Sequence, residues 1–347
     1  MATVSHLLEH GLQHQKAGRL RDAELSYREA LAQDRCNSDG LHLLGLVCHQ
    51  NGRHAEAADL IAQAIAQNDR VAIYHSNLGL ALLSLGRTTD GVACQWRAVA
   101  LEPDLLQAHM LLNEALLPGE HYHGVLARLH DALKPPLYIE IGVETGGSLA
   151  AARPPTIALG VDPQPRIERS FTADTRIFEM TSDAFFASID LAAASGRAGF
   201  DLAFIDGLHT FDQTLRDFIN LERLAQPRAV VLVHDCLPLS APTATREQRT
   251  RFWSGDTWRL VPLLKRARPD LIVRTIACRP TGLALITGLD PGSTALETRF
   301  GALVDEFIDL PFEYLAEDRD AKLNVIANDW PTIERHLTTA PGGAAAP

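Results

Sequence analysis

The sequence predicts an all-α solenoid at the N-terminus, followed by a doubly wound α/β sheet. Three observations support this fold class: a 34-residue repeat in the first third of the chain, an alternation of short apolar strands with helical stretches after Pro136, and a glycine-rich loop behind the first of these strands. Repeats of this length are typical of stacked helical pairs. Strands that alternate with helices predict a parallel sheet covered on both faces.

The repeat is visible in small residues at fixed positions. In three sets of residues, each member lies 34 residues after the one before it. The sets are Gly11, Gly45 and Gly79; Gly18, Gly52 and Gly86, each followed by arginine; and Ala30, Ala64 and Ala98. We expect the first glycine of each unit, and the small residues Ala23, Ala57 and Gly91, where two antiparallel helices approach closely. The later glycines allow the positive φ that the end of a helix requires.

Residues 5–117 resemble tetratricopeptide repeats, in three units plus a capping helix. The matching residues are Leu44-Gly45, Leu78-Gly79, Tyr27 and the Gly-Arg turns. The resemblance implies a curved solenoid whose concave face binds a peptide or another subunit. Self-association, or capping of the domain that follows, stays open as an alternative. Residues 118–136 are expected to form a linker with one short helix that ends at the double proline.

The second part of the sequence predicts six strands, at residues 137–141, 156–161, 200–205, 229–233, 271–277 and 283–287. Helices are expected at residues 149–152, 212–224 and 258–266. The last two strands are too close for a crossover helix, so they should pair antiparallel. Residues 291–338 are expected to form a helical extension, and residues 339–347 a disordered tail.

A nucleotide-type ligand is predicted at the carboxyl ends of the strands. The first strand ends in a loop with glycines at Gly142, Gly146 and Gly147, which lets the backbone approach a ligand. Asp162 ends the second strand about 20 residues later, where a carboxylate accepts hydrogen bonds from both ribose hydroxyls. The glycines do not form the GxGxxG loop that binds a pyrophosphate, and Glu140 suits a cationic amino-acid ligand. The loop therefore favours an adenosyl amino acid over a nicotinamide dinucleotide.

Three segments in order resemble the class I S-adenosylmethionine-dependent methyltransferases, in particular the bacterial family called methyltransferase type 24. They are the glycine loop from Glu140 to Ser148, the strand end FIDGLH at residues 204–209 and the strand end LVHDC at residues 232–236. The resemblance covers about residues 137–290 and implies a Rossmann-like methyltransferase domain. It implies that S-adenosylmethionine is bound by Glu140, Gly142, Gly146, Gly147, Ser148, Asp162 and Asp206. Pro227-Arg228 replaces a Gly-Gly pair of the family, which affects a turn rather than the chemistry.

Asp206 and His209 are the predicted catalytic residues. Transfer of a methyl group to a hydroxyl requires removal of a proton, and a histidine with an ordinary pKa of about 6.5 suits a general base. His209 lies three residues after Asp206, at the end of a strand. The alternative is that His209 only orients the loop.

A divalent metal is a further candidate ligand of this edge. In metal-dependent O-methyltransferases of related fold, an aspartate at the place of Asp206 shares the ion with an acidic pair that ends the next strand. The corresponding residues here are His234 and Asp235. His234 in place of an oxygen ligand disfavours Mg²⁺ and favours a transition metal. Hydrogen bonding by these strand ends without a metal stays open.

The polar, irregular stretch at residues 237–256 is expected to contact the methyl acceptor, because long loops in compact domains are often functional. Arg251 and Trp253 are the predicted substrate residues. The guanidinium groups of Arg246, Arg249 and Arg251 suit a phosphate or carboxylate, and a tryptophan ring can stack on a sugar.

We therefore expect an S-adenosylmethionine-dependent O-methyltransferase of a saccharide, glycan or other hydroxylated small molecule, with repeats that bind a protein partner or a second copy. The alternative is a non-catalytic repeat scaffold whose cofactor-binding domain has degenerated. The formal net charge of -11 argues against nucleic acid or an anionic membrane as partner. The sequence shows no apolar run long enough for a membrane helix and no signal peptide, so we expect a cytoplasmic protein.

Overall fold

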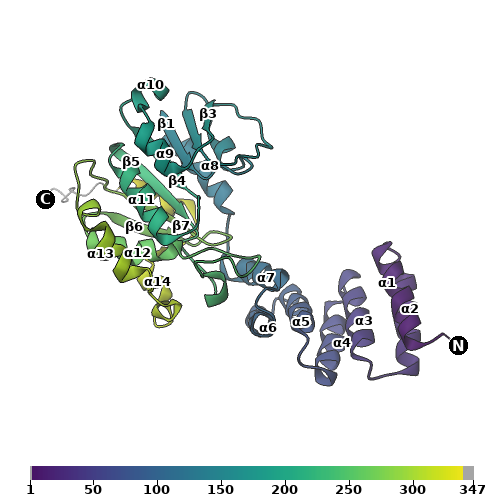
Figure 1. The fold of residues 1–347 in the computed structure, drawn as a ribbon. Helices are drawn as coiled ribbons and strands as arrows, with labels where there is room; N and C mark the ends of the chain where they lie inside the picture. Colours follow the sequence, from purple (N-terminus) through teal and green to yellow (C-terminus); the bar gives the residue numbers. More distant parts are fainter. Residues whose placement is uncertain (1, 339–347) are drawn as a thin grey trace. The chain divides into compact units, whose positions relative to one another are not determined.

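The computed structural model describes residues 2–338, so the predicted disordered tail lies outside the described residues. The chain divides into two compact units. The first runs up to Leu116 and includes Thr250–Phe252, and the second comprises Leu117–Arg249 and the residues from Trp253 on (Figure 1). Among the described residues, no helix combines the length and the apolar character that crossing a membrane requires.

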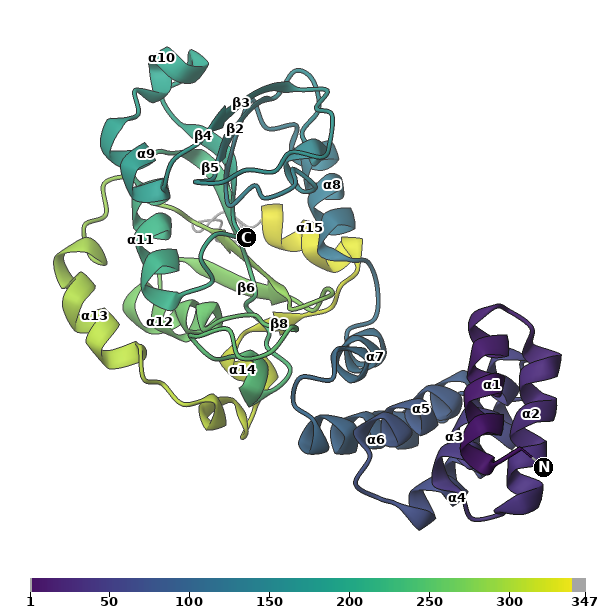
Figure 2. The same ribbon diagram turned by 45° about the vertical axis from the view of Figure 1, so that its right-hand side comes forward.

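The described part of the N-terminal unit consists of helices α1 (Val4–Lys16), α2 (Leu20–Gln33), α3 (Ser38–Gln50), α4 (His54–Gln67), α5 (Ala72–Ser84), α6 (Thr88–Leu101) and α7 (Leu106–Leu116). Consecutive helices form the antiparallel hairpins α1/α2, α3/α4 and α5/α6, and each hairpin packs on the next (Figure 2). The predicted helical repeat is therefore confirmed.

Two kinds of glycine produce the repeat. Gly18, Gly52 and Gly86 follow the first helix of each hairpin with φ values of 75°, 77° and 75°, a conformation that glycine adopts without a steric penalty. Gly45 lies where α3 meets α4, and a Cβ on it would be 2.6 Å from Cγ1 of Ile61. The turn within each hairpin and the close contact between its helices therefore recur with the same period, because both positions require a residue without a Cβ.

The C-terminal unit contains an eight-stranded sheet in the order β3-β2-β1-β4-β5-β7-β6-β8. Its strands are β1 (Leu137–Ile141), β2 (Ile157–Val161), β3 (Asp174–Phe178), β4 (Phe200–Ile205), β5 (Ala225–His234), β6 (Ile272–Ile276), β7 (Leu283–Thr287) and β8 (Val325–Ile326). Strands β1 to β5 pair in parallel, whereas β7 is antiparallel to both β5 and β6. The strand order reverses at β1, between β2 and β4, and such a reversal is where ligands of doubly wound sheets bind.

Helices cover both faces of this sheet. Val125 of α8 (Tyr122–Leu133) and Ile333 of α15 (Trp330–Thr338) pack with Tyr138 of β1 in one apolar core. Figure 2 shows α8 and α15 on the opposite side of the sheet from α9 and α11. The remaining helices of the unit are α9 (Ser182–Ser188), α10 (Leu191–Ser195), α11 (Phe211–Glu222), α12 (Leu260–Ala267), α13 (Phe300–Phe307) and α14 (Arg319–Lys322).

The predicted linker and C-terminal extension are both part of the folded unit. Residues 118–136 contain α8, whose Leu126 and Leu129 are fully buried. Residues 291–338 contain β8 as well as helices, and β8 pairs with β6. Both segments were expected to lie outside the sheet domain, but their apolar side chains cover a sheet face that would otherwise be exposed to water.

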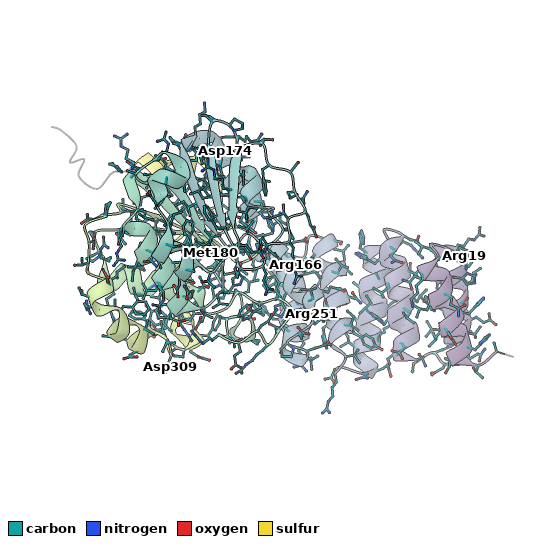
Figure 3. All side chains as sticks on the ribbon, turned by 45° about the horizontal axis from the view of Figure 1, so that its top comes forward. Arg19, Arg166, Asp174, Met180, Arg251 and Asp309 are labelled. Carbon is teal, nitrogen blue, oxygen red and sulfur yellow. The ribbon has the colours of Figure 1, made fainter. Side chains whose placement is uncertain are left out.

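Two local predictions also differ from the structure. The helix expected at residues 149–152 is a single 3₁₀ turn, Leu149–Ala151, because Pro154 and Pro155 follow too closely for a longer helix. Strand β3 was not predicted at all. Its first three residues are polar and only the last two, Ile177 and Phe178, are apolar, and Asp174 projects into solvent (Figure 3), so no apolar run marks it.

Candidate active site

A cavity of about 640 Å³ opens at the carboxyl ends of β1, β2 and β4, where the strand order reverses. Five residues singled out in the sequence line it: Gly142, Asp162, Asp206, His209 and Trp253. Cavities of roughly 300–1,000 Å³ are typical of small-molecule sites. The volume is therefore within the range of small-molecule sites.

The glycine loop packs tightly against the end of β4. Gly142 has a φ of 87°, and a Cβ on it would lie 2.1 Å from the carbonyl oxygen of Asp206. Gly146 has a φ of 80° and lies under the ring of Phe171. A Cβ on Gly147 would have its nearest neighbour, an atom of His123, at 3.5 Å. Close backbone packing therefore requires glycine at Gly142, the positive φ favours it at Gly146, and neither applies to Gly147. Only Gly142 of the three lines the cavity.

Asp162 shapes the same loop from the end of β2. Its Oδ2 accepts hydrogen bonds from the backbone N–H groups of Val143 and Glu144, both at 2.9 Å, and its Oδ1 accepts one from Gln164 at 2.7 Å. A carboxylate has room for about four hydrogen bonds. Asp162 can therefore fix the loop and still accept from a ligand in the cavity.

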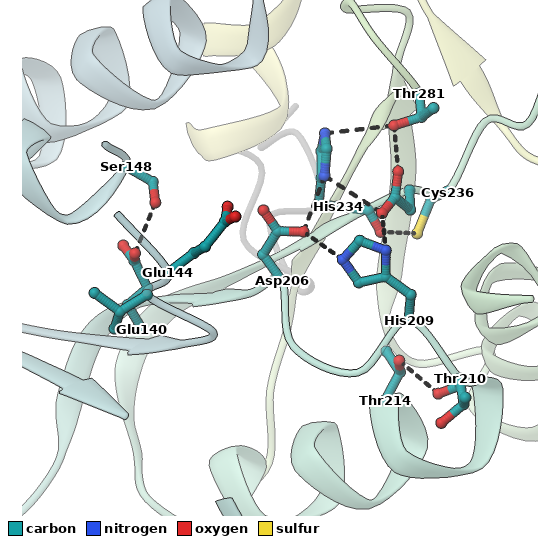
Figure 4. Close-up of polar contacts among 12 residues, drawn as sticks. Glu140, Glu144, Ser148, Asp206, His209, Thr210, Thr214, His234, Cys236 and Thr281 are labelled. Carbon is teal, nitrogen blue, oxygen red and sulfur yellow. Dashed lines mark hydrogen bonds and ion pairs between the residues drawn. The ribbon is translucent and has the colours of Figure 1, made fainter. Parts of the chain in front are cut away.

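Glu140 and Ser148 do not line the cavity, and Figure 4 shows their side chains bonded to each other. Glu140 is fully buried, and its carboxylate accepts hydrogen bonds from the hydroxyl groups of Tyr138 and Ser148. Burial raises the pKa of Glu140 to about 8, although these hydrogen bonds act in the opposite direction. The two predicted cofactor residues thus support the glycine loop from within the core.

Two aspartates and two histidines meet where β4 and β5 end (Figure 4). His209 Nε2 is 3.3 Å from Asp206 Oδ1, and His209 Nδ1 is 2.9 Å from Asp235 Oδ2. His234 Nδ1 is 3.0 Å from the same oxygen of Asp206 and 3.5 Å from Asp235 Oδ2. The hydroxyl of Thr281 donates a hydrogen bond to Asp235. Each carboxylate is therefore shared by both imidazole rings.

This cluster holds both histidines in the protonated form. Burial alone would lower the pKa of His209, but the charges of Asp235 and Asp206 raise it to about 11. Burial would also lower the pKa of His234, but the charges of Asp206 and, to a lesser extent, Asp235 raise it to about 10. Burial would raise the pKa of both aspartates, and the histidines lower it instead. In this arrangement His209 carries the proton that a general base has to lack.

The backbone around the cavity adopts conformations that are rare outside glycine. Glu144, His209 and Asp235 have φ values of 45°, 57° and 60°, each at a cost of about 1–3 kcal/mol. Gly255 completes this packing, because a Cβ on it would lie 1.9 Å from the carbonyl oxygen of His209. Such strain is typical of functional sites.

Trp253 forms a wall of the cavity beside His209. The two rings are 5.3 Å apart with an interplanar angle of 23°, and the indole N–H donates a hydrogen bond of 2.6 Å to the carbonyl oxygen of Thr245. Its apolar face is thus fixed next to the charged cluster.

The loop arginines have acidic partners of their own. Arg246 pairs with Asp212 at 2.7 Å. Arg251 belongs to the N-terminal unit, where its backbone N–H and its side chain both bind Asp104. Of the two predicted substrate residues, only Trp253 therefore lines the cavity.

Five polar residues that the sequence did not predict also line the cavity: Thr181, Ser182, Asp183, Gln213 and Asp217. The first three follow β3, which the sequence did not reveal. Gln213 and Asp217 lie four residues apart on α11 and therefore on one helix face. Two features of the sequence could have identified these residues. One is the four-residue spacing of Gln213 and Asp217, and the other is Thr181 as a helix cap, which accepts a hydrogen bond from the N–H of Ala184.

Three side chains of the cluster could hold a metal ion. One ligand atom from each of Asp206, His209 and Asp235 lies within 4.8 Å of the others. This set contains His209 where the sequence suggested His234, whose Nδ1 bonds to Asp206 and whose Nε2 is 3.4 Å from the hydroxyl of Thr281. Two carboxylates with one imidazole suit a transition metal better than Mg²⁺.

The paired histidines predict a fall in stability at alkaline pH for protein treated with a chelator. Their folded-state pKa values lie above the ordinary value, so their contribution is complete below about pH 6.5 and is lost as the pH rises towards 10–11. We expect the free energy of unfolding to fall by up to about 1.4 kcal/mol per pH unit for each histidine. Urea unfolding at pH 6.5, 8 and 9.5, followed by tryptophan fluorescence, measures this slope.

His209→Gln and His234→Gln serve as controls for that slope, because each removes one of the two titrating groups. Each variant should lose part of the pH dependence. A wild-type protein whose unfolding free energy is constant over this range would contradict the charge pairing described above.

Comparison with known proteins agrees with both units. A family model described as a methyltransferase domain matches residues 139–236, and one described as a tetratricopeptide repeat matches residues 8–70 and 50–104. Similar solved structures include the first tetratricopeptide domain of Spaghetti (RPAP3) bound to an HSP90 peptide, at 21% identity over 33% of this chain and 90% of that chain with a TM-score of 0.32. A second is MamA, at 23% identity over 32% of this chain and 66% of that chain, with a TM-score of 0.31. A third is an O-GlcNAc transferase mutant of Thermobaculum terrenum, at 22% identity over 59% of this chain and 46% of that chain, with a TM-score of 0.33. The two family models therefore identify tetratricopeptide repeats within the N-terminal unit and a methyltransferase domain within the C-terminal unit.

Proposed function

We propose that the C-terminal unit transfers a methyl group from S-adenosylmethionine to a hydroxyl group of a saccharide or other hydroxylated small molecule. One observation supports this proposal above all: Asp162 and the Asp206–His209 pair line one cavity, next to the close-packed Gly142. A carboxylate that can bind the ribose of the donor and a group that can transfer the proton of the acceptor thus line the same cavity. Methyl transfer is a displacement that depends on such alignment.

The donor would lie across the strand ends. Its ribose hydroxyls would donate hydrogen bonds to Asp162, and its positively charged sulfonium would lie towards Asp206 at the end of β4. The cavity wall also contains Glu144, which suits the cationic amino group of the donor. S-adenosylmethionine supplies the methyl group as an activated sulfonium substituent, so the protein has to orient the two reactants and handle one proton.

His209 is the group best placed to handle that proton. Its two ring nitrogens face Asp206 and Asp235, which hold it as an imidazolium, so acceptance of a proton first requires loss of the one it carries. Asp206, Asp235 and His209 would hold a divalent cation, which would take the place of the imidazolium proton and lower the pKa of a nearby hydroxyl. In that state His209 would serve as a metal ligand, and the ion would promote loss of the hydroxyl proton. The donor set of Asp206, Asp235 and one imidazole fits such an ion.

The acceptor that this cavity favours is neutral rather than anionic. No lysine or arginine is among the described residues that line the cavity, and Arg246 is already paired with Asp212. Trp253 and Leu208, which is 66% exposed, offer apolar surface at the wall. A tryptophan ring of this kind stacks on the apolar face of a sugar, so a saccharide fits better than a phosphorylated or carboxylated compound.

The repeats would bind a protein partner or a second copy of the chain, as such solenoids commonly do. The cytoplasm is the compartment that the proposal implies, because the cysteines of the described residues are free thiols and thiols persist in a reducing compartment.

Calorimetric titration tests the donor. We expect micromolar binding of S-adenosylmethionine and of its demethylated product, and no measurable binding of NAD. Incubation of the protein and radiolabelled donor with small molecules extracted from cells that lack the gene then tests the acceptor. Binding of NAD alone would overturn the proposal. Tight donor binding without label transfer to any extract would instead support the non-catalytic scaffold.

A further inference from the structure

Asp256 is a fully buried carboxylate that the proposed methyl transfer does not use. Its backbone N–H donates a hydrogen bond of 3.2 Å to the carbonyl oxygen of His209. Its Oδ1 accepts a hydrogen bond of 2.6 Å from the backbone N–H of Phe211, the first residue of α11. Asp256 therefore holds the backbone on both sides of Thr210, directly next to His209.

The carboxylate of Asp256 is itself fixed by two arginines. Arg259 donates a hydrogen bond of 2.6 Å to its Oδ2 and, through Nε, one of 3.0 Å to the carbonyl oxygen of Leu310. The guanidinium of Arg246 lies 3.6 Å from the same Oδ2. Burial of a carboxylate costs free energy unless the group is paired and hydrogen-bonded, and here both oxygens have partners. Asp256 is therefore a rigid support for the turn that it contacts.

Capping of α11 does not by itself explain this arrangement. Thr210 is the N-cap of α11, with φ -110° and ψ 137°, and from such a conformation a threonine side chain usually accepts a hydrogen bond from the first turn of its helix. The Thr210 hydroxyl makes no cap bond and is buried without a hydrogen-bond partner. The acceptor comes instead from Asp256, 45 residues beyond Phe211. A local cap would satisfy the helix without contact to His209, whereas Asp256 contacts both.

His209 is the residue on which this support acts. Its φ of 57° costs free energy in any residue other than glycine and persists only where the surroundings enforce it. Gly255 packs against the carbonyl oxygen of His209, so two consecutive residues hold the backbone in this state. The imidazole lies 3.3 Å from Asp206 Oδ1 and 2.9 Å from Asp235 Oδ2. A change of φ at His209 would move the ring out of that position.

We propose that Asp256 is a positioning residue for the methyl transfer, which keeps His209 in its strained conformation and so fixes the imidazole between Asp206 and Asp235. The consequence for turnover rests on the proposed function, whereas the position of the ring can be measured without it. Asp256 is not among the residues that line the cavity, so it acts through His209. Displacement of a reacting group by about 1 Å can reduce a rate by about 100-fold.

The first measurement follows the ring of His209 by NMR, in full-length protein with ¹³C-labelled histidine. Trp253 stacks on this ring at 5.3 Å, so the indole should shift the C–H resonances of His209, which are assigned by their loss in His209→Gln. In Asp256→Ala these resonances should move towards the range of unstacked histidines. Glu222→Ala removes another buried, arginine-paired carboxylate, from the last residue of α11, and should leave them in place.

The second measurement separates positioning from capping. Asp256→Ala should reduce label transfer from saturating S-adenosylmethionine by about 100-fold, while donor affinity stays within about threefold of the wild type. Thr210→Asp supplies α11 with a local cap. Added to Asp256→Ala, it should restore resistance to urea but not turnover, whereas Thr210→Asp alone should keep the wild-type turnover.

Unchanged His209 resonances in Asp256→Ala would overturn the inference, and so would full recovery of turnover in the double variant, because both would leave Asp256 with a capping role only. If Asp256→Ala does not fold alone, the double variant retains a cap and takes its place in both measurements. A shift of the resonances in Asp256→Ala, with no label transfer even by the wild-type protein, would support the positioning of His209 and remove the proposed function instead.

Discussion

Replacing Asp162 with alanine is expected to weaken binding of S-adenosylmethionine by about 100-fold or more. The carboxylate fixes the glycine loop through Val143 and Glu144 and, in the proposed complex, accepts hydrogen bonds from the ribose hydroxyls. Each hydrogen bond to a charged group contributes about 1.5–3 kcal/mol, and 1.4 kcal/mol corresponds to a tenfold change in affinity. Loss of two ribose contacts therefore accounts for the expected effect, and it is measured by calorimetric titration.

Two variants separate the ribose contacts from a general effect on folding. Asp162→Asn keeps one acceptor oxygen and should lose less affinity than Asp162→Ala. Asp174→Ala removes an exposed carboxylate at the opposite end of the neighbouring strand and should bind the donor as the wild type does. If Asp162→Ala bound the donor within about threefold of the wild type, the proposed placement of the ribose would be wrong.

Substitution of His209 by alanine should reduce the turnover of the proposed reaction by about 100- to 10,000-fold, the usual contribution of a positioned acid–base group. Donor affinity should change little, because the proposed ribose contacts come from Asp162. In chelator-treated wild-type protein, the pair of carboxylates that raises the pKa of His209 to about 11 should make the rate increase with pH through the neutral range. Label transfer at saturating donor, at several pH values, measures both effects.

The control for this variant is His10→Ala, which removes an exposed histidine of α1 and should leave turnover unchanged. Turnover of His209→Ala at the wild-type level would exclude His209 as the group that handles the proton. A turnover loss together with an equal loss of donor affinity would indicate that His209 shapes the cavity instead.

Features that depend on local sterics could be predicted from the sequence. The 34-residue period identifies the turns because Gly52 must adopt a φ of 77° and because Gly45 has no room for a Cβ. The buried strands β1, β2, β4 and β7 appear as short apolar runs. Strand β3 lies at the edge of the sheet with polar residues on its exposed side, so its formation depends on pairing with β2 and leaves no apolar run in the sequence.

The candidate site shows the same division. Asp206, His209 and Asp235 follow apolar strands, and parallel strands bring their carboxyl ends together, so their proximity could be predicted. Glu140 has an equally suggestive position next to the glycine loop but faces the core. Successive residues of a strand point to opposite faces, and Glu140 shares its face with Tyr138, which packs under α8. Whether the side chain of Glu140 points into the core or into the cavity depends on which helices cover each face of the sheet. The sequence of the glycine loop does not contain that information.

The short 3₁₀ turn after the glycine loop limits which cofactors this fold can acquire. Dinucleotide-binding loops rely on the partial positive charge of a long helix that begins at the loop and faces the diphosphate. Between β1 and β2, a region that the structure describes throughout, the only helical segment is Leu149–Ala151. Conversion of this domain to a dinucleotide enzyme would therefore require a new helix as well as new glycine spacing.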